Sequence, residues 1–154
     1  MRSKHPARGF TLIELMIALS VATILAVIAV SSYRSTILRS NRQLASRMLV
    51  DLAAKQEDYK IRHRSYANGF DALVGIDTDT LYVNRAGKLG AASAADSRFK
   101  IEIDDATASS YTLLATAVND QSHDASCQTW SLTHLGIKSA TGGGTNPVKD
   151  CWGG

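Results

Sequence analysis

The sequence predicts an α+β protein in which a long N-terminal α-helix packs on a small antiparallel β-sheet and a disulfide closes the C-terminal region. Three observations lead to this prediction. Residues 10–30 are almost entirely apolar, no Gly or Pro occurs between Thr11 and Asn68, and the last third of the chain holds short alternating segments together with both cysteines. A long helix should therefore precede a β-rich domain.

The apolar segment Phe10–Val30 contains 21 residues, and Glu14 is its only charged side chain. As a helix with a rise of about 1.5 Å per residue it would be roughly 31 Å long, close to the ~30 Å hydrocarbon core of a bilayer. We expect one transmembrane helix at residues 10–30. An ionisable group inside a span is costly unless it meets a partner, so the presence of Glu14 needs a specific reason.

The charges on either side of the span predict its orientation. Residues 1–9 contain Arg2, Lys4 and Arg8 and no acidic residue. The positive-inside rule places this end in the cytoplasm and the rest of the chain outside. Without these nine residues the chain has 14 basic and 14 acidic residues, divided into a net charge of +4 at residues 10–64 and −4 at residues 65–154.

The junction Gly9-Phe10-Thr11-Leu12-Ile13-Glu14 resembles the processing site of the type IV pilins, which have a class III leader. The resemblance implies that a prepilin peptidase removes residues 1–9 after Gly9 and that Phe10 becomes N-methylated. It also implies that Glu14 serves assembly by meeting the positive N-terminus of a neighbouring subunit. The expected partners are other pilin subunits, the peptidase and the pilus assembly machinery of the inner membrane.

Two other interpretations of this segment stay open at the sequence level. Ala29-Val30-Ser31 is an acceptable small-residue cleavage site for a secretory signal, and the segment could also be a plain membrane anchor. Against a secretory signal, the apolar run is longer than the usual core of about 7–15 residues and carries Glu14 near its start.

Residues 31–64 change from apolar to amphipathic, which predicts that one face of a continuous helix packs on the head domain, residues 65–154. Arg34, Arg39, Arg42 and Arg47 lie largely off the apolar stripe, and we expect them on a solvated face or near lipid headgroups. Many pilins have a helix-bending proline near Ser31-Ser32, which this chain lacks, so the family's kink is not predicted here. The apolar stripe consists of Tyr33, Ile37, Leu38, Leu44, Ala45, Met48, Leu49, Leu52, Ala53 and Tyr59.

The head domain is predicted to begin with a connecting region, residues 65–97, in which Tyr66 and Leu73 resemble the residues that pilins place under the sheet. Strands are expected at residues 99–103, 111–118 and 128–133, and residues 135–138 are expected to form a turn and a short fourth strand. The Gly-rich tail, residues 140–154, should supply little regular structure. Spacing of the acidic residues after Asp77 excludes an EF-hand, because Tyr82 and Lys88 occupy positions that such a loop needs for Gly and Glu.

Cys127 and Cys151 are the only cysteines, and a head in an oxidising compartment favours a disulfide between them. The pair also matches the C-terminal disulfide region of the pilins. A metal site would need further ligands, and no His or third Cys is placed to provide them. No catalytic motif, cofactor or metal site is predicted, and we do not expect an enzyme.

The resulting functional hypothesis is a structural subunit, most similar to the minor pilins, of a type IV pilus used for motility, adhesion or DNA uptake. Such a subunit would leave the inner membrane to join an extracellular filament. The alternatives are a pseudopilin of type II secretion and a receptor pilin that binds DNA. Nucleic acid is not an expected partner because the head is acidic, although Arg98, Lys100 and Lys138 could form a local basic patch.

Overall fold

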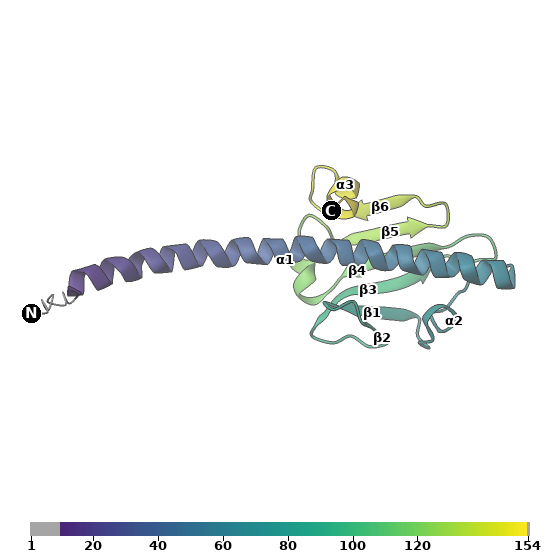
Figure 1. Cartoon of the computed structure of the whole chain (residues 1–154). Helices are drawn as coiled ribbons and strands as arrows, with labels where there is room; N and C mark the ends of the chain where they lie inside the picture. Colours follow the sequence, from purple (N-terminus) through teal and green to yellow (C-terminus); the bar gives the residue numbers. More distant parts are fainter. Residues whose placement is uncertain (1–9, 154) are drawn as a thin grey trace, which may run out of the picture. The chain divides into compact units, whose positions relative to one another are not determined.

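The computed structural model describes residues 10–153, which form two compact units with their boundary between Ile37 and Leu38. The first unit is helical. The second contains a six-stranded antiparallel sheet, two short helices, a 3₁₀ turn and the remainder of the long helix (Figure 1). The predicted fold class, a long helix with an antiparallel sheet and a C-terminal disulfide, is confirmed.

The long helix α1 spans Leu12–His63, which is 52 residues. It is continuous because no Gly or Pro occurs between Thr11 and Asn68, and Ser31-Ser32 is helical like its neighbours. The helix ends where Arg64 adopts a left-handed conformation with φ 60°. Among the described residues it is the one helix that is long and apolar enough to cross a membrane, and none of the residues in its most apolar window is buried.

The sheet has the strand order β2-β1-β3-β4-β5-β6, and every neighbouring pair is antiparallel. Short loops connect most strands that are consecutive in the sequence, as in β-hairpins. The prediction of three central strands is confirmed within a few residues. The strands are β1 (Thr80–Asn84), β2 (Leu89–Gly90), β3 (Ser97–Asp104), β4 (Thr112–Ala117), β5 (Thr129–Thr133) and β6 (Lys138–Thr141).

One strand prediction was wrong, and another differs in its bounds. The supposed connecting region contains β1 and β2, because Leu81 and Val83 alternate with polar residues and pair with Ile101 and Phe99 on the buried face. A turn and a short fourth strand were predicted at residues 135–138, and both exist, although residues 135–137 belong to the turn between β5 and β6 and the strand extends beyond residue 138. Gly136 has φ 75°, and Thr133 donates its backbone N–H to the carbonyl of Ile137, so the strand begins at Lys138.

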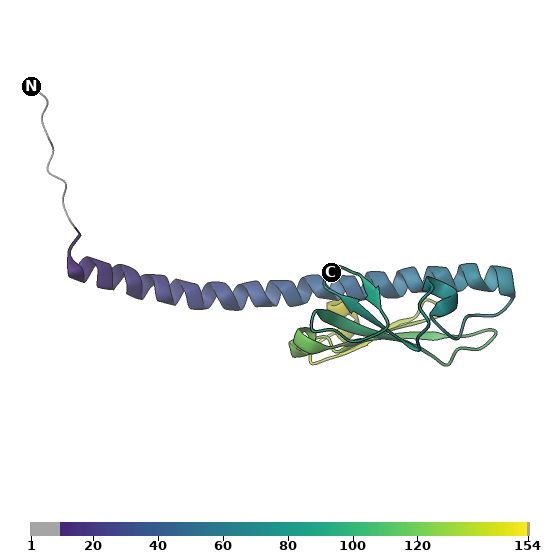
Figure 2. The same ribbon diagram turned by 90° about the horizontal axis from the view of Figure 1, so that it is seen from below.

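The core lies between the second half of α1 and one face of the sheet (Figure 2). Ala45, Leu49 and Leu52 from α1 are at most 1% exposed. Burial of this stripe confirms that the helix is amphipathic, and Tyr66 and Leu73 also pack in or against the core as predicted. Tyr33 was wrongly placed on the stripe, since it is 65% exposed. From the sheet the core receives Leu81, Val83, Phe99, Ile101, Leu113, Ala115 and Trp130.

The buried face of α1 also contains two amides that the apolar pattern did not predict, Asn41 and Gln56. Gln56 donates its side-chain N–H to the carbonyl of Ala67 and accepts the N–H of Ala67, both at 2.9 Å. This pairing satisfies both ends of the buried amide and fixes the chain as it leaves α1.

The tail is more regular than predicted, because it contains the short helix α3, Pro147–Trp152. Asn146 caps this helix by accepting the backbone N–H of Lys149 at 3.1 Å, and Pro147 follows at the first helical position. Both residues are preferred at these positions. The other helical elements are α2 (Asp71–Val74) and the 3₁₀ turn η1 (Asn119–His123).

Candidate functional site

The side chains of Thr11 and Glu14 cap the first turn of α1. The hydroxyl of Thr11 accepts the N–H of Glu14 at 3.3 Å, and the carboxylate of Glu14 accepts the N–H of Thr11 at 3.4 Å. This reciprocal pair is a capping box, in which both residues satisfy backbone donors that a helix N-terminus leaves unpaired. The spacing Thr-x-x-Glu is typical of a capping box and is visible in the sequence. The sequence-based hypothesis for Glu14 considered only its role in pilus assembly.

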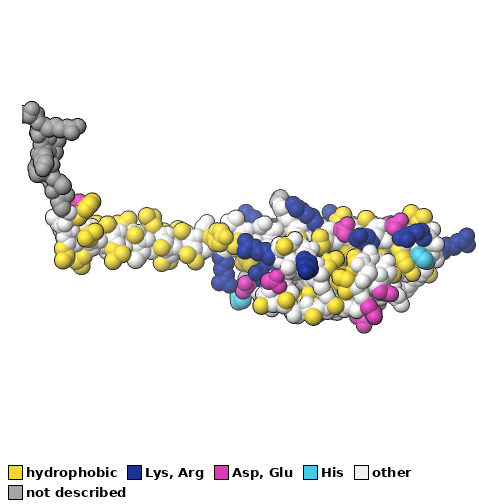
Figure 3. Space-filling view, turned by 60° about the horizontal axis from the view of Figure 1, so that its bottom comes forward, with side chains coloured by type: hydrophobic (Ala, Val, Ile, Leu, Met, Phe, Trp, Pro, Cys, Tyr) yellow, Lys and Arg dark blue, Asp and Glu magenta, His cyan; other side chains and the backbone are white. Residues whose placement is uncertain are grey.

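The apolar residues that follow have no packing partner among the described residues of their own unit. Leu12, Ile17, Leu19, Ile24 and Ile28 are each at least 60% exposed, and Figure 3 shows hydrophobic side chains along this stretch. Phe10, the expected mature N-terminus, is 79% exposed. Gly9 lies outside the described residues, so the cleavage site and the assembly role of Glu14 stay predictions.

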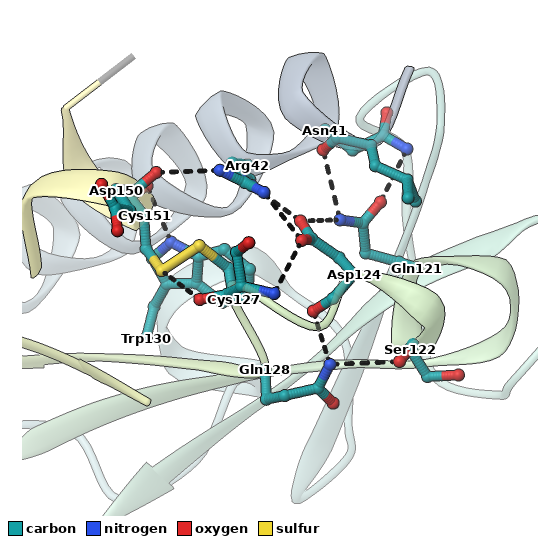
Figure 4. A network of polar contacts seen from close by, with 12 residues as sticks. Asn41, Arg42, Gln121, Ser122, Asp124, Cys127, Gln128, Trp130, Asp150 and Cys151 are labelled. Atoms are coloured by element: carbon teal, nitrogen blue, oxygen red, sulfur yellow. Dashed lines mark hydrogen bonds and ion pairs between the residues drawn. A yellow bond between two sulfur atoms is a disulfide. The ribbon is translucent and has the colours of Figure 1, made fainter. Parts of the chain in front are cut away.

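In the second unit, α1 is joined to η1 and its following loop by an ion pair between Arg42 and Asp124 (Figure 4). Arg42 donates from Nε to one carboxylate oxygen at 2.7 Å and from Nη2 to the other at 2.8 Å. The Asp124 side chain is 3% exposed. Such a two-pronged contact fixes both groups in position. Arg42 is therefore not a solvated residue, contrary to the sequence-based expectation.

Neighbouring side chains extend this contact into a network. Asn41 donates to Gln121 at 2.9 Å, and Gln121 donates to Asp124 at 3.2 Å. The pKa of Arg42 is raised above its ordinary value, first by the hydrogen bonds to Asp124 and further by the negative charges of Asp124 and Asp150, while burial acts in the opposite direction. The guanidinium thus stays charged and holds the loop after η1 against α1.

The disulfide between Cys127 and Cys151 is formed, as predicted, and it ties α3 to the loop just before β5. The carbonyl of Cys151 accepts the indole N–H of Trp130 at 3.0 Å and the hydroxyl of Ser46 at 3.3 Å. Arg42 also donates to the carbonyl of Asp150 at 3.2 Å. The ion pair and the disulfide therefore hold α1, the sheet and the tail together at one place (Figure 4).

The basic patch suggested around Arg98, Lys100 and Lys138 is not formed. In the register of β3 and β4, Lys100 lies opposite Thr116, on the face of the sheet away from the buried residues Phe99 and Ile101. In the register of β5 and β6, Lys138 lies opposite Leu132, on the core-facing side of the sheet. Its Nζ is 5.0 Å from the centroid of the Trp152 ring. Residues directly opposite in a sheet share one face, so these cations lie on different faces. Arg98 and Lys100 are also paired with Asp120 and Glu102.

A different set of basic residues lies at the C-terminal end of α1. Lys60, Arg62, His63 and Arg64 follow one another closely, and we refer to them as the basic end of α1. Lys60 lies 4.1 Å from the centroid of the Tyr66 ring, and Arg62 pairs with Asp58. Arg64 is exposed and is in no ion pair among the residues that the structure describes. The apolar stripe of α1 predicted a packing element and gave no indication of this set.

Comparison with known proteins gives two matching family models. The model described as "Type IV minor pilin ComP, DNA uptake sequence receptor" matches residues 31–131. The model described as "Prokaryotic N-terminal methylation motif" matches residues 4–30. A relative, the "Type IV wide pilus major component PilA4" of Thermus thermophilus, is 32% identical over 88 residues, which cover 57% of this chain and 67% of the relative. Together with the long helix, the antiparallel sheet and the terminal disulfide, these matches confirm the resemblance, and the chain belongs to the family of the type IV minor pilin ComP, DNA uptake sequence receptor.

Proposed function

We propose that this protein is a minor structural subunit of a type IV pilus. Its apolar helix, residues 10–30, anchors it in the inner membrane and then joins the helical core of the filament. The observation that carries this proposal is that every side chain from Leu12 to Val30, most of them apolar, is exposed in a helix long enough to span a bilayer. Such a surface needs lipid or other apolar helices around it.

Processing and assembly follow from the same segment. A prepilin peptidase cleaves after Gly9 and the new N-terminus at Phe10 is methylated, which the match of residues 4–30 to the methylation motif supports. Glu14 then pairs with the N-terminal ammonium of an adjacent subunit, because a buried carboxylate in the filament core needs a positive partner. Pilins are a structural family, and no catalytic role is part of this proposal.

The family match also favours a pilus subunit over a pseudopilin of type II secretion. The two related descriptions name a type IV minor pilin and a pilus component. The two alternatives differ in where the protein ends up, because a pseudopilin forms no surface filament under ordinary conditions.

Mass spectrometry of sheared filaments tests the assignment. Pili are sheared from wild-type cells and from cells lacking this gene, and tryptic peptides of residues 65–153 are quantified against those of the major subunit. We expect these peptides at low abundance in wild-type filaments only. Their confinement to the membrane fraction of piliated cells would contradict the proposal. An inner-membrane protein without a pilin helix serves as the contamination control.

A second candidate function is DNA uptake, with this subunit as the receptor. The specific observation in its favour is the family description, which names a DNA uptake sequence receptor and matches residues 31–131. Those residues include the basic end of α1. The acidic charge that argued against DNA belongs to residues 65–154, whereas residues 10–64 carry a net charge of +4. Lys60 and Arg64 are suited to phosphate contacts at this end of the head.

Fluorescence anisotropy with a labelled DNA duplex and the detergent-solubilised full chain tests this function. Arg64→Asn suits the site because Asn tolerates the left-handed conformation of residue 64. We expect weaker binding and a salt dependence whose slope falls by about 1, as for loss of one phosphate contact. Arg85→Ala, in the exposed turn between β1 and β2, is the control and should bind like the wild type. Equal binding by both variants would exclude the basic end of α1 as the DNA surface.

A further inference from the structure

A groove in the second unit lies between α1 and α3 and has a volume of about 300 Å³. It is lined by Arg39, Arg42, Lys149, Asp150 and Gly153. This volume is at the lower end of the range of small-ligand sites, about 300–1,000 Å³. Three of the five lining residues are cations, and they come from parts of the sequence more than 100 residues apart.

The charges of this groove favour a singly charged anion. Arg42 is already neutralised by its two hydrogen bonds to Asp124. Arg39 and Lys149 are exposed and form no ion pair among the described residues, while Asp150 supplies one negative charge. The remaining balance is one positive charge, which a phosphodiester or a carboxylate would neutralise. Two cations near one anionic oxygen make charge-assisted hydrogen bonds, which are stronger than neutral ones.

The position of Lys149 depends on the closed tail. Lys149 lies two residues before Cys151, whose disulfide to Cys127 holds α3 in place, and Arg42 donates to the carbonyl of Asp150. The N–H of Lys149 is bonded to the side chain of Asn146, which fixes the start of the helix. The groove is therefore a property of the folded and oxidised tail, whereas Arg39 alone would be an ordinary surface residue on α1.

One residue of the groove, Arg39, lies close in sequence to the apolar segment. Arg39 follows Val30, the last residue of the apolar segment, by nine residues. Even fully extended, nine residues reach at most about 30 Å, and as helix they correspond to about 14 Å. Residues 31–50 contain four arginines and no acidic residue. A basic segment next to a span is attracted to anionic lipid headgroups.

We propose that Arg39 and Lys149 bind the phosphate of an anionic membrane lipid while the subunit is anchored in the membrane before assembly. This inference rests on the membrane-anchored state in the proposed function. The bound headgroup would hold the closed tail against the membrane surface, and extraction of the subunit into a filament would release it. Because Lys149 contributes one of the two cations, opening the disulfide should weaken the site.

Lysine acylation of the full chain in lipid nanodiscs tests this proposal. The protein is inserted into discs of phosphatidylcholine alone or with phosphatidylglycerol, and insertion is checked by co-elution. An amine-reactive ester is added, and the acylation rate of Lys149 is measured by mass spectrometry relative to Lys88, which lies outside the groove. We expect acylation of Lys149 to slow roughly fivefold in the anionic discs, the effect of one cation at a charged surface.

Two matched variants distinguish the groove from general surface charge. Arg39→Gln should abolish the protection of Lys149, whereas Arg47→Gln, an exposed arginine of α1 outside the groove, should preserve it. An equal effect of the two variants, or equal rates in both kinds of disc, would overturn the proposal. Protection in phosphatidylcholine discs by added inorganic phosphate or by a DNA duplex, as strong as that by anionic lipid, would also overturn it. Pilus incorporation is measured separately, so failure of the proposed function would not be confused with failure of the groove.

Discussion

Arg42 and Asp124 form a two-pronged ion pair, with N···O distances of 2.7 and 2.8 Å, although they are 82 residues apart in the sequence. The pair connects α1 to the loop after η1, and the same guanidinium reaches the carbonyl of Asp150 beside the disulfide. Arg42 therefore links α1 both to the loop after η1 and to the disulfide-closed tail.

Replacing Arg42 with Met should destabilise the head strongly. The change leaves Asp124, whose side chain is 3% exposed, without its positive partner. Breaking a buried pair costs about 3–5 kcal/mol, and we expect a value near 3 because Arg42 itself keeps some exposure. The melting temperature of the detergent-solubilised chain, followed by circular dichroism, should fall by roughly 10–20 °C.

Two further variants control this experiment. Arg47→Met removes an exposed arginine from the same helix and should change the melting temperature very little. In Arg42→Met combined with Asp124→Leu, much of the lost stability should return because no unpaired charge remains buried. If the single and double variants melted at the same temperature, the ion pair would not be the source of the effect.

Reduction of Cys127–Cys151 should loosen the tail and destabilise the head. The bridge closes a loop with a sequence separation of 24, which in the chain-entropy estimate corresponds to about 3.5 kcal/mol. We expect reductant to lower the melting temperature by roughly 10–20 °C. The variant with both cysteines replaced by Ser should melt near the reduced wild type and should not respond to reductant. A wild-type transition that reductant leaves unchanged would contradict this prediction.

Alkaline pH should destabilise the head through Tyr111. Its burial, with smaller effects of Glu57 and Tyr66, raises the pKa of Tyr111 from 10.0 to about 12. The unfolded chain therefore ionises first, so the stability contributed by neutral Tyr111 is complete below pH 10 and is lost as the pH rises towards 12. The change should be of the order of 2 kcal/mol.

Denaturant unfolding at several pH values between 8 and 12 measures this effect. Tyr111→Phe should flatten the fall in the free energy of unfolding over this range. Tyr33→Phe is the matched control, because Tyr33 is 65% exposed and its removal should leave the pH profile unchanged. Parallel profiles for the wild type and Tyr111→Phe would show that Tyr111 does not cause the alkaline loss.

Processing at Gly9 can be tested on the precursor. Gly9→Val places a branched side chain at the proposed cleavage site, and we expect the full-length precursor to accumulate in the membrane. Gly69→Ala, far along the chain in the loop before α2, controls for effects of losing a glycine elsewhere. N-terminal mass spectrometry of the wild type should give a methylated Phe10. A mature chain that began near Ser32 would instead identify a secretory signal.

Local sequence patterns predicted most of the fold, whereas contacts between residues far apart in the sequence were not predicted. The helix followed from the absence of Gly and Pro, and β3 from the alternation of Phe99 and Ile101 with charged residues. In contrast, β1 is only five residues long between polar segments, so its alternation was too short to stand out. Arg42 gave no local sign of its role because Asp124, its partner, becomes a neighbour only after the sheet and helix have packed together.

The site at the start of α1 raises a different question, because two physical reasons now account for Glu14. One is the capping box with Thr11, which stabilises the first turn of the helix. The other is the proposed pairing with the N-terminus of an adjacent subunit. The two reasons differ in what they require, since Gln can replace Glu in a capping box but cannot supply a negative charge.

Three substitutions separate these roles. Glu14→Gln keeps the cap and loses the charge, Thr11→Val loses the hydroxyl of the cap and keeps the charge, and Glu14→Ala loses both. If charge pairing drives assembly, both Glu14 variants should be inserted and processed normally but enter sheared pili poorly, because each joining subunit would bury an unpaired ammonium at a cost of about 3–5 kcal/mol. Thr11→Val should then assemble at near wild-type abundance. Normal assembly of Glu14→Gln, together with poor assembly of Thr11→Val, would assign Glu14 to helix capping and remove the charge from the mechanism of assembly.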